Sequence, residues 1–149
     1  MTDVPGGCLC GALRYRVTLP SLWCAFCHCG MCRKAHGASP VAWFGVPRDR
    51  FAWIASPDEH LGRYASSPGA TRSFCRRCGS PLLFESERWA DQVHVALATL
   101  DGTLDRPPSA HVFFDDRAGW ATPTDDLPRL GGPDGTTPIA PPDGSGRSR

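Results

Sequence analysis

Eight cysteines dominate this 149-residue sequence, because every one of them belongs to a short-range cluster. Thiolates that are one to three residues apart can turn toward a single metal ion without a long connecting loop. The spacing therefore predicts that the cysteine clusters bind metal ions, which cross-link segments of the chain. The clusters are the pair Cys8 and Cys10, the run Cys24, Cys27, Cys29 and Cys32, and the pair Cys75 and Cys78.

Disulfide bonds are the other use of eight cysteines, and the sequence disfavours them. The N-terminal stretch has neither a positively charged segment nor an apolar segment, so we expect no signal peptide. A protein that stays in the reducing cytoplasm keeps its thiols reduced. A bond between Cys8 and Cys10 would also be strained. We therefore expect reduced cysteines and a cytoplasmic location.

The charge and hydropathy of the chain disfavour two classes of partner. The formal net charge is +1, which provides no broad attraction to nucleic acid or to a membrane surface. No apolar run approaches the roughly 18 residues that a membrane-spanning helix needs. We therefore expect neither a nucleic-acid partner nor a membrane partner.

The hydrophobic pattern favours a mostly β domain built from short antiparallel strands. Alternation or continuous apolar runs predict strands over residues 13–19, 41–46, 51–54, 82–84, 92–97 and 111–114, with a weaker strand over 61–65. A short helical turn is expected over 33–36. Residues 1–130 form the predicted domain. Residues 131–149 are rich in Gly and Pro and are predicted to be a disordered tail.

The two outer cysteine pairs fit a closed structural zinc site. Cys8, Cys10, Cys75 and Cys78 supply four thiolates, the ligand number of a tetrahedral all-sulfur site. Such a site joins segments that are far apart in the sequence. The alternative is a set of reduced, buried cysteines without a metal.

The central run leaves two alternatives open. Cys27, Cys29 and Cys32 can hold a second zinc with three thiolates, which leaves one position for water or substrate, as in catalytic zinc sites. If Cys24 or His28 supplies a fourth ligand, the second site is closed and structural. Four ligands within nine consecutive residues make a cramped chelate, which favours the open site.

Three motifs in this order resemble those of the glutathione-dependent formaldehyde-activating enzyme family, also known by the CENP-V/GFA domain. The resemblance covers residues 4 to 130, and the order of the motifs is more specific than any one of them. The motifs are Gly6-Gly7-Cys8-Leu9-Cys10-Gly11, Cys27-His28-Cys29-Gly30-Met31-Cys32-Arg33-Lys34 and Phe74-Cys75-Arg76-Arg77-Cys78-Gly79.

The resemblance implies a tent-shaped β fold with two zinc ions. In the family pattern, Cys8, Cys10, Cys75 and Cys78 hold the structural zinc, and Cys27, Cys29 and Cys32 hold a catalytic zinc. The implied activity is that of a carbon–sulfur lyase, which joins formaldehyde to glutathione to give S-hydroxymethylglutathione. Glutathione or a similar small thiol is thus the expected partner.

Other functions compete with this interpretation. A non-catalytic zinc module that binds a macromolecule is the main alternative, and a thiol redox protein that uses Cys75 and Cys78 is a minor one.

Basic side chains beside the clusters either capture a carboxylate-bearing thiol or compensate the charge of the thiolates. These residues are Arg33, Lys34, His36, Arg76 and Arg77. His28 is a candidate for proton transfer. The remaining histidines, His36, His60, His94 and His111, are predicted to be surface residues or hydrogen-bonded core residues. The aromatic residues Tyr15, Trp43, Phe44, Phe51, Trp53 and Trp120 are predicted to lie in the core.

Overall fold

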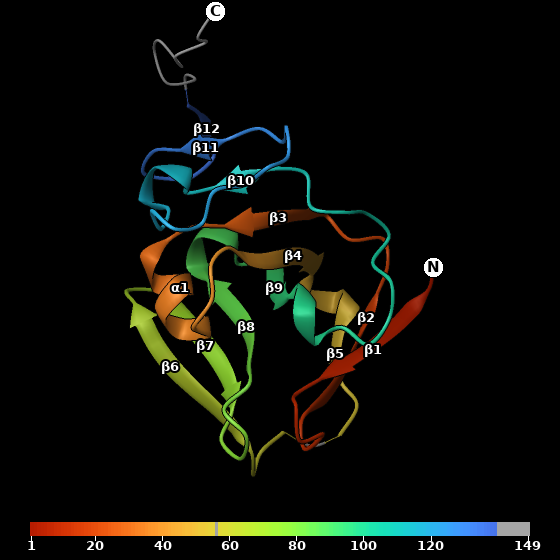
Figure 1. The fold of residues 1–149 in the computed structure, drawn as a ribbon. Helices are drawn as coiled ribbons and strands as arrows, with labels where there is room; N and C mark the ends of the chain where they lie inside the picture. Colours follow the sequence, from red (N-terminus) through yellow and green to blue (C-terminus); the bar gives the residue numbers. More distant parts are fainter. Residues whose placement is uncertain (56, 140–149) are drawn as a thin grey trace, which may run out of the picture.

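A computed structural model describes residues 1–55 and 57–139 of the chain, and it is built mainly from β-strands (Figure 1). The larger sheet has seven strands in the order β10-β3-β4-β9-β8-β7-β6. Its strands are β3 (Trp23–Cys27), β4 (Val41–Pro47), β6 (Leu61–Ser67), β7 (Ala70–Cys75), β8 (Pro81–Ser86), β9 (Gln92–Ala96) and β10 (His111–Val112).

A three-stranded sheet, in the order β1-β2-β5, packs against one face of the larger sheet. The remaining elements are short. The strands of the smaller sheet are β1 (Asp3–Gly7), β2 (Arg14–Thr18) and β5 (Phe51–Trp53); the single α-helix of the described residues is α1 (Gly30–His36), and four 3₁₀ turns are η1 (Arg48–Arg50), η2 (Glu87–Trp89), η3 (Leu97–Thr99) and η4 (Phe114–Asp116).

The main core lies between the two sheets. Tyr15 and Val17 of β2 face Phe44 and Val46 of β4, and all four side chains are fully buried. Successive side chains of a strand point to opposite faces. Phe44 and Val46 therefore face this core, whereas Trp43 and Gly45 lie on the other face of the seven-stranded sheet. Both faces of β4 are covered, in agreement with its continuous apolar sequence.

The strands expected around residues 13–19, 41–46 and 92–97 correspond to β2, β4 and β9. Most strand pairs are antiparallel, as expected, but β10 pairs in parallel with β3. Strand β10 is shorter than predicted because Phe113 adopts a left-handed conformation with φ of 51°. Of the aromatic residues expected in the core, Trp120 is 72% exposed, so its assignment to the core is wrong.

The division of the chain at residue 130 remains a prediction, but its expected tail is partly described. Leu130–Gly131 (β11) and Thr137–Pro138 (β12) form an antiparallel pair, and the carbonyl oxygen of Gly135 accepts a hydrogen bond from Phe113 N at 3.0 Å. Local glycine turns and backbone pairing thus organise residues 131–139 in the structure, and the disorder of the tail stays a prediction. Residues 140–149 lie outside the described part of the chain.

Within the described residues, no helix has the length and apolar character needed to cross a membrane.

Candidate metal centres and the adjoining cavity

The outer cysteine pairs meet in space. The Sγ atoms of Cys8, Cys10, Cys75 and Cys78 all lie within 4.8 Å of one another. Cys10 Sγ is 3.6 Å from Cys8 Sγ and 3.8 Å from Cys75 Sγ. Tetrahedral zinc with Zn–S bonds of about 2.3 Å places its sulfurs about 3.8 Å apart. The spacing and the all-sulfur donor set therefore fit a metal ion such as zinc.

Two glycines shape the loops that present these thiols. Gly11 and Gly79 have φ of 81° and 79°, a conformation that other residues adopt at a cost. Each donates its backbone N–H to the first cysteine of its pair, since Gly11 N bonds the Cys8 carbonyl and Gly79 N bonds the Cys75 carbonyl. The turns fold each pair back on itself, which brings its two sulfurs to the same side.

Hydrogen bonds to sulfur support the outer group. Leu13 N donates to Cys8 Sγ at 3.2 Å, and the Ser80 hydroxyl lies 3.2 Å from Cys78 Sγ. The same hydroxyl accepts a hydrogen bond from Leu9 N at 2.9 Å, so it links the two loops. Donors around a sulfur stabilise the thiolate form that binds a metal.

The central cysteines form a second group with three members. Cys27 ends β3, Cys29 caps the first turn of α1, and Cys32 lies inside that helix. Their sulfurs lie within 4.8 Å of one another. Hydrogen bonds from Cys27 and Cys29 lower the pKa of Cys32, and the nearby Arg72 guanidinium lowers it further. The group fits a metal ion that has three protein ligands.

Cys24 does not join the central group. It lies three residues before Cys27 on β3, and an odd step along a strand places two side chains on opposite faces. Its side chain is fully buried in the core between the sheets, beside Phe44. Among the described residues, neither Cys24 nor His28 belongs to the group of possible ligands. Of the two arrangements that the sequence left open, the geometry fits the three-thiol one.

His28 instead begins a buried hydrogen-bonded chain. Its Nε2 lies 2.7 Å from His111 Nδ1, and His111 Nε2 lies 3.0 Å from both oxygens of Asp125. A carboxylate only accepts, so His111 donates from Nε2 and, with both rings neutral, accepts from His28 at Nδ1. His28 Nδ1 is buried without a hydrogen-bond partner in the described part of the chain. Sequence reasoning missed this chain because its members lie far apart in the sequence.

The histidine predictions have different outcomes. His111 is a buried, hydrogen-bonded residue, as expected. His94 is also buried, but its Nε2 has no partner among the described residues, which differs from the expectation. His36 packs edge-on against Trp43, and His60 pairs with Glu59 at 3.7 Å.

Arg72, which lies outside the three cysteine motifs, contacts a cysteine sulfur. Its Nη2 donates to Cys32 Sγ at 3.6 Å, and its guanidinium lies 5.0 Å from the centre of the Phe84 ring. Its Nη1 is buried and has no hydrogen-bond partner within the described residues. Arg33 instead donates to the Asp116 carbonyl. The sequence did not predict this contact because Arg72 lies 40 residues from Cys32 and belongs to none of the cysteine motifs.

A cavity of about 680 Å³ adjoins the three central thiols on the face of the seven-stranded sheet that is opposite the core. One line of paired residues crosses five strands on this face: Trp23, Gly45, His94, Phe84 and Arg72. Trp23 lies across Gly45, where an added Cβ would come within 2.4 Å of its indole nitrogen. The glycine therefore lets Trp23 pack edge-on against His94, with a ring distance of 4.6 Å.

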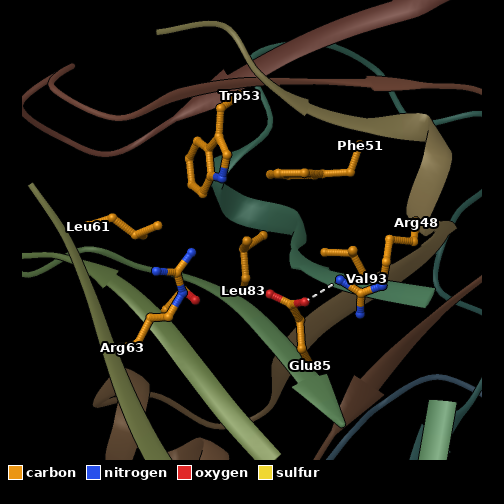
Figure 2. A pocket seen from close by; sticks show the side chains of 9 residues that line it. Arg48, Phe51, Trp53, Leu61, Arg63, Leu83, Glu85 and Val93 are labelled. Atoms are coloured by element: carbon orange, nitrogen blue, oxygen red, sulfur yellow. Dashed lines mark hydrogen bonds and ion pairs between the residues drawn. The ribbon is translucent and has the colours of Figure 1, made fainter. Parts of the chain in front are cut away.

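A second, smaller cavity of about 250 Å³ lies on the other face, between the two sheets (Figure 2). None of the cysteines lines it. Arg48 and Glu85 form an ion pair of 2.5 Å at its edge. It is lined by Arg48, Phe51, Trp53, Leu61, Arg63, Ser73, Leu83, Glu85 and Val93.

Comparisons with known proteins agree with this geometry. The family model described as glutathione-dependent formaldehyde-activating enzyme matches residues 3–116, which include both cysteine groups. A Halomonas elongata protein, whose name gives the same enzyme as an unconfirmed assignment, is 34% identical over 124 residues, which are 77% of each chain. An uncharacterised lyase of Schizosaccharomyces pombe is 30% identical over 123 residues, 78% of this chain and 82% of that protein.

A solved structure is similar as well. The crystal structure of a Rhodobacter sphaeroides protein superposes with a TM-score of 0.57 at 26% identity, and the match covers 68% of this chain and 92% of that one. The family model, the two relatives and the shared fold lead to one conclusion: this chain belongs to the glutathione-dependent formaldehyde-activating enzyme family.

Proposed function

We propose that this protein is a zinc-dependent carbon–sulfur lyase that acts on an adduct of a small thiol and an aldehyde, of the S-hydroxymethylglutathione type. One observation carries the proposal: three converging thiols border a cavity of about 680 Å³, and no fourth ligand joins them among the described residues. The family membership and the lyase relative support it. A non-catalytic module would not require this cavity beside an incomplete ligand set.

The two cysteine groups have different roles in this proposal. Cys8, Cys10, Cys75 and Cys78 hold a structural zinc, because four thiolates complete a tetrahedron. Cys27, Cys29 and Cys32 hold the second zinc and leave one position for a ligand from outside the protein. A zinc ion with such a position supplies Lewis-acid chemistry and favours the deprotonated form of a thiol.

The reaction itself is an addition without a redox step. The sulfur electron pair forms the carbon–sulfur bond, the carbonyl π pair moves to oxygen, and the proton lost by the thiol ends on that oxygen. The reverse reaction releases thiol and aldehyde. Arg72 places a positive charge beside Cys32, with Nη1 unpartnered among the described residues. We assign to this guanidinium charge the attraction of a substrate carboxylate, since hydrogen bonds between a guanidinium and a carboxylate are charge-assisted.

We place this activity in the cytoplasm, where both the protein thiols and a substrate such as glutathione stay reduced.

The test combines metal counting with a direct assay. Zinc per chain is measured by mass spectrometry, and exchange between free and thiol-bound aldehyde is followed by NMR with glutathione and several aldehydes. We expect two zinc ions and accelerated exchange. Cys32→Ala should lose one ion and the acceleration, whereas Cys24→Ala should retain both. An intact two-zinc protein that accelerates exchange for no thiol–aldehyde pair would refute the proposal.

A further inference from the structure

The cavity beside the central thiols has an aromatic lining that the hydroxymethyl group of a formaldehyde adduct does not use. Its volume of about 680 Å³ is that of a pocket for a drug-sized ligand, which a tripeptide adduct already is, so the lining rather than the volume indicates the substrate. Its walls carry five aromatic side chains, those of Trp23, Trp43, Phe84, Trp89 and Phe113. Four of these five, all except Trp43, are only partly buried. Exposed aromatic surface that lines a cavity favours an apolar occupant.

Three polar groups among these rings have partners or carry no charge, and the exception is the Arg72 guanidinium, which lies over Phe84. Trp23 Nε1 donates to Gln92 Oε1 at 3.0 Å, and Arg88 pairs with Asp134. His94 contacts Trp23, Trp89 and Phe84. Burial lowers the pKa of His94 to about 4, so the ring is neutral at pH 7. Away from Arg72, this wall therefore offers a ligand apolar surface and little charge.

The aromatic wall reaches the thiols through Arg72. The same guanidinium lies over the Phe84 ring and donates to Cys32 Sγ. Phe84 in turn contacts Trp43 at 6.4 Å and His94 at 5.8 Å between ring centres. A ligand whose sulfur lies at the three thiols consequently has Phe84 and its neighbouring rings beside the substituent on that sulfur.

We propose that the adduct handled at this site carries a large apolar group, aromatic or extended aliphatic, which packs on the wall formed by Trp23, Phe84, Trp89 and Phe113. This inference rests on the proposed function and specifies its substrate class. The group belongs either to the aldehyde or to the thiol. The covalent step is the same in both cases: a carbon–sulfur bond forms or breaks, and one proton moves between sulfur and oxygen.

Binding of unreactive thioethers to the zinc-loaded protein tests the wall separately from catalysis. S-(2-phenylethyl)glutathione imitates the adduct of phenylacetaldehyde, and S-methylglutathione imitates that of formaldehyde. Burial of a phenyl-sized group gives an expected Kd that is tenfold to a hundredfold lower for the phenylethyl compound, measured by calorimetry. Equal Kd values would overturn the inference.

Variants localise the effect. Trp89→Ala should remove most of the preference for the phenylethyl compound and leave the Kd of S-methylglutathione nearly unchanged. Trp120→Ala is the matched control, because this tryptophan is 72% exposed and does not line the cavity, and it should change neither value. An unchanged preference in a folded Trp89→Ala protein would contradict the assigned wall. The comparison in the unmodified protein stands even if Trp89→Ala fails to fold.

The exchange assay distinguishes the two sources of the apolar group and separates this inference from the proposed function. Its pairs are glutathione with phenylacetaldehyde, 2-phenylethanethiol with formaldehyde, and glutathione with formaldehyde. For each pair, the quantity compared is the acceleration of exchange over the uncatalysed reaction. The largest acceleration for the first pair supports an apolar aldehyde, and for the second pair an apolar thiol. The largest acceleration for the third pair overturns the inference but supports the proposed function. No acceleration for any pair, with tighter phenylethyl binding, refutes the lyase and retains the apolar site.

Discussion

Cys24 shows how one side chain can resemble a metal ligand in the sequence and belong to the core in the structure. It is fully buried between the sheets, and burial raises the pKa of its thiol to about 11. A protonated thiol in such surroundings packs as a small apolar group. Cys24 therefore stabilises the fold through its packing, whereas Cys27 on the opposite face belongs to the three converging thiols that could hold a metal ion.

Replacement of this residue gives a clear prediction. Cys24→Ala should retain both zinc ions and lower the free energy of unfolding by about 1 kcal/mol, the cost of a small core deletion. Cys32→Ala should lose one ion. Zinc content by mass spectrometry and urea unfolding measure the two effects. Loss of one ion from Cys24→Ala would identify Cys24 as a ligand.

His94 makes stability depend on pH. Its pKa is lowered from 6.5 to about 4 by burial, so the unfolded chain binds a proton between these values that the folded chain does not. The free energy of unfolding therefore falls as the pH falls through this window, by about 2 kcal/mol between pH 7 and pH 5. His94→Phe should remove the contribution of His94 to this decrease in the free energy of unfolding. Urea unfolding at both pH values checks it, and an identical loss in wild type and variant would contradict it.

At the scale of elements, the sequence predicted β2, β4 and β9 because their apolar patterns are local. It did not predict β3, since Trp23–Cys27 contains two cysteines that suggested a ligand loop. With β3 recognised as a strand, its two-residue period places Cys24 on the opposite face from Cys27 and thus apart from the three converging thiols. The predicted turn at 33–36 is the second half of α1, which begins at Gly30 because Cys29 Sγ accepts from Cys32 N and caps the helix.

Gly45 of strand β4 leaves room for Trp23, which lines the cavity. Gly45→Ala would place its Cβ 2.4 Å from Trp23 Nε1, so the indole must move and lose its bond to Gln92. We expect a loss of about 1–3 kcal/mol in the free energy of unfolding, measured with urea. Gly119→Ala is the control, since nothing lies within 4 Å of its added Cβ. Equal stability of the two variants would show that Trp23 is not held across β4.

At the scale of the molecule, the features that the sequence could not predict are contacts between segments that lie far apart in the chain. The outer cysteines were grouped correctly because each pair is local and the ligand number of zinc supplied the rest. The chain from His28 through His111 to Asp125 and the contact between Arg72 and Cys32 join segments that no local pattern relates. The cavity likewise exists only once five strands are paired in register.

If both cysteine groups bind zinc as proposed, they restrain the whole molecule unequally. The outer group joins the loop before β2 to the loop after β7, and Cys10 and Cys75 are 65 residues apart, whereas the central ligands lie within six consecutive residues. In the chain-entropy model of cross-links, closing a 65-residue loop stabilises by about 4 kcal/mol and a six-residue loop by about 2 kcal/mol. Cys78→Ser should therefore lower the Tm by several degrees more than Cys29→Ser. Thermal unfolding followed by circular dichroism, with zinc content measured for each variant, provides the comparison. Equal decreases in Tm would show that the outer site does not act as the clamp between the two sheets.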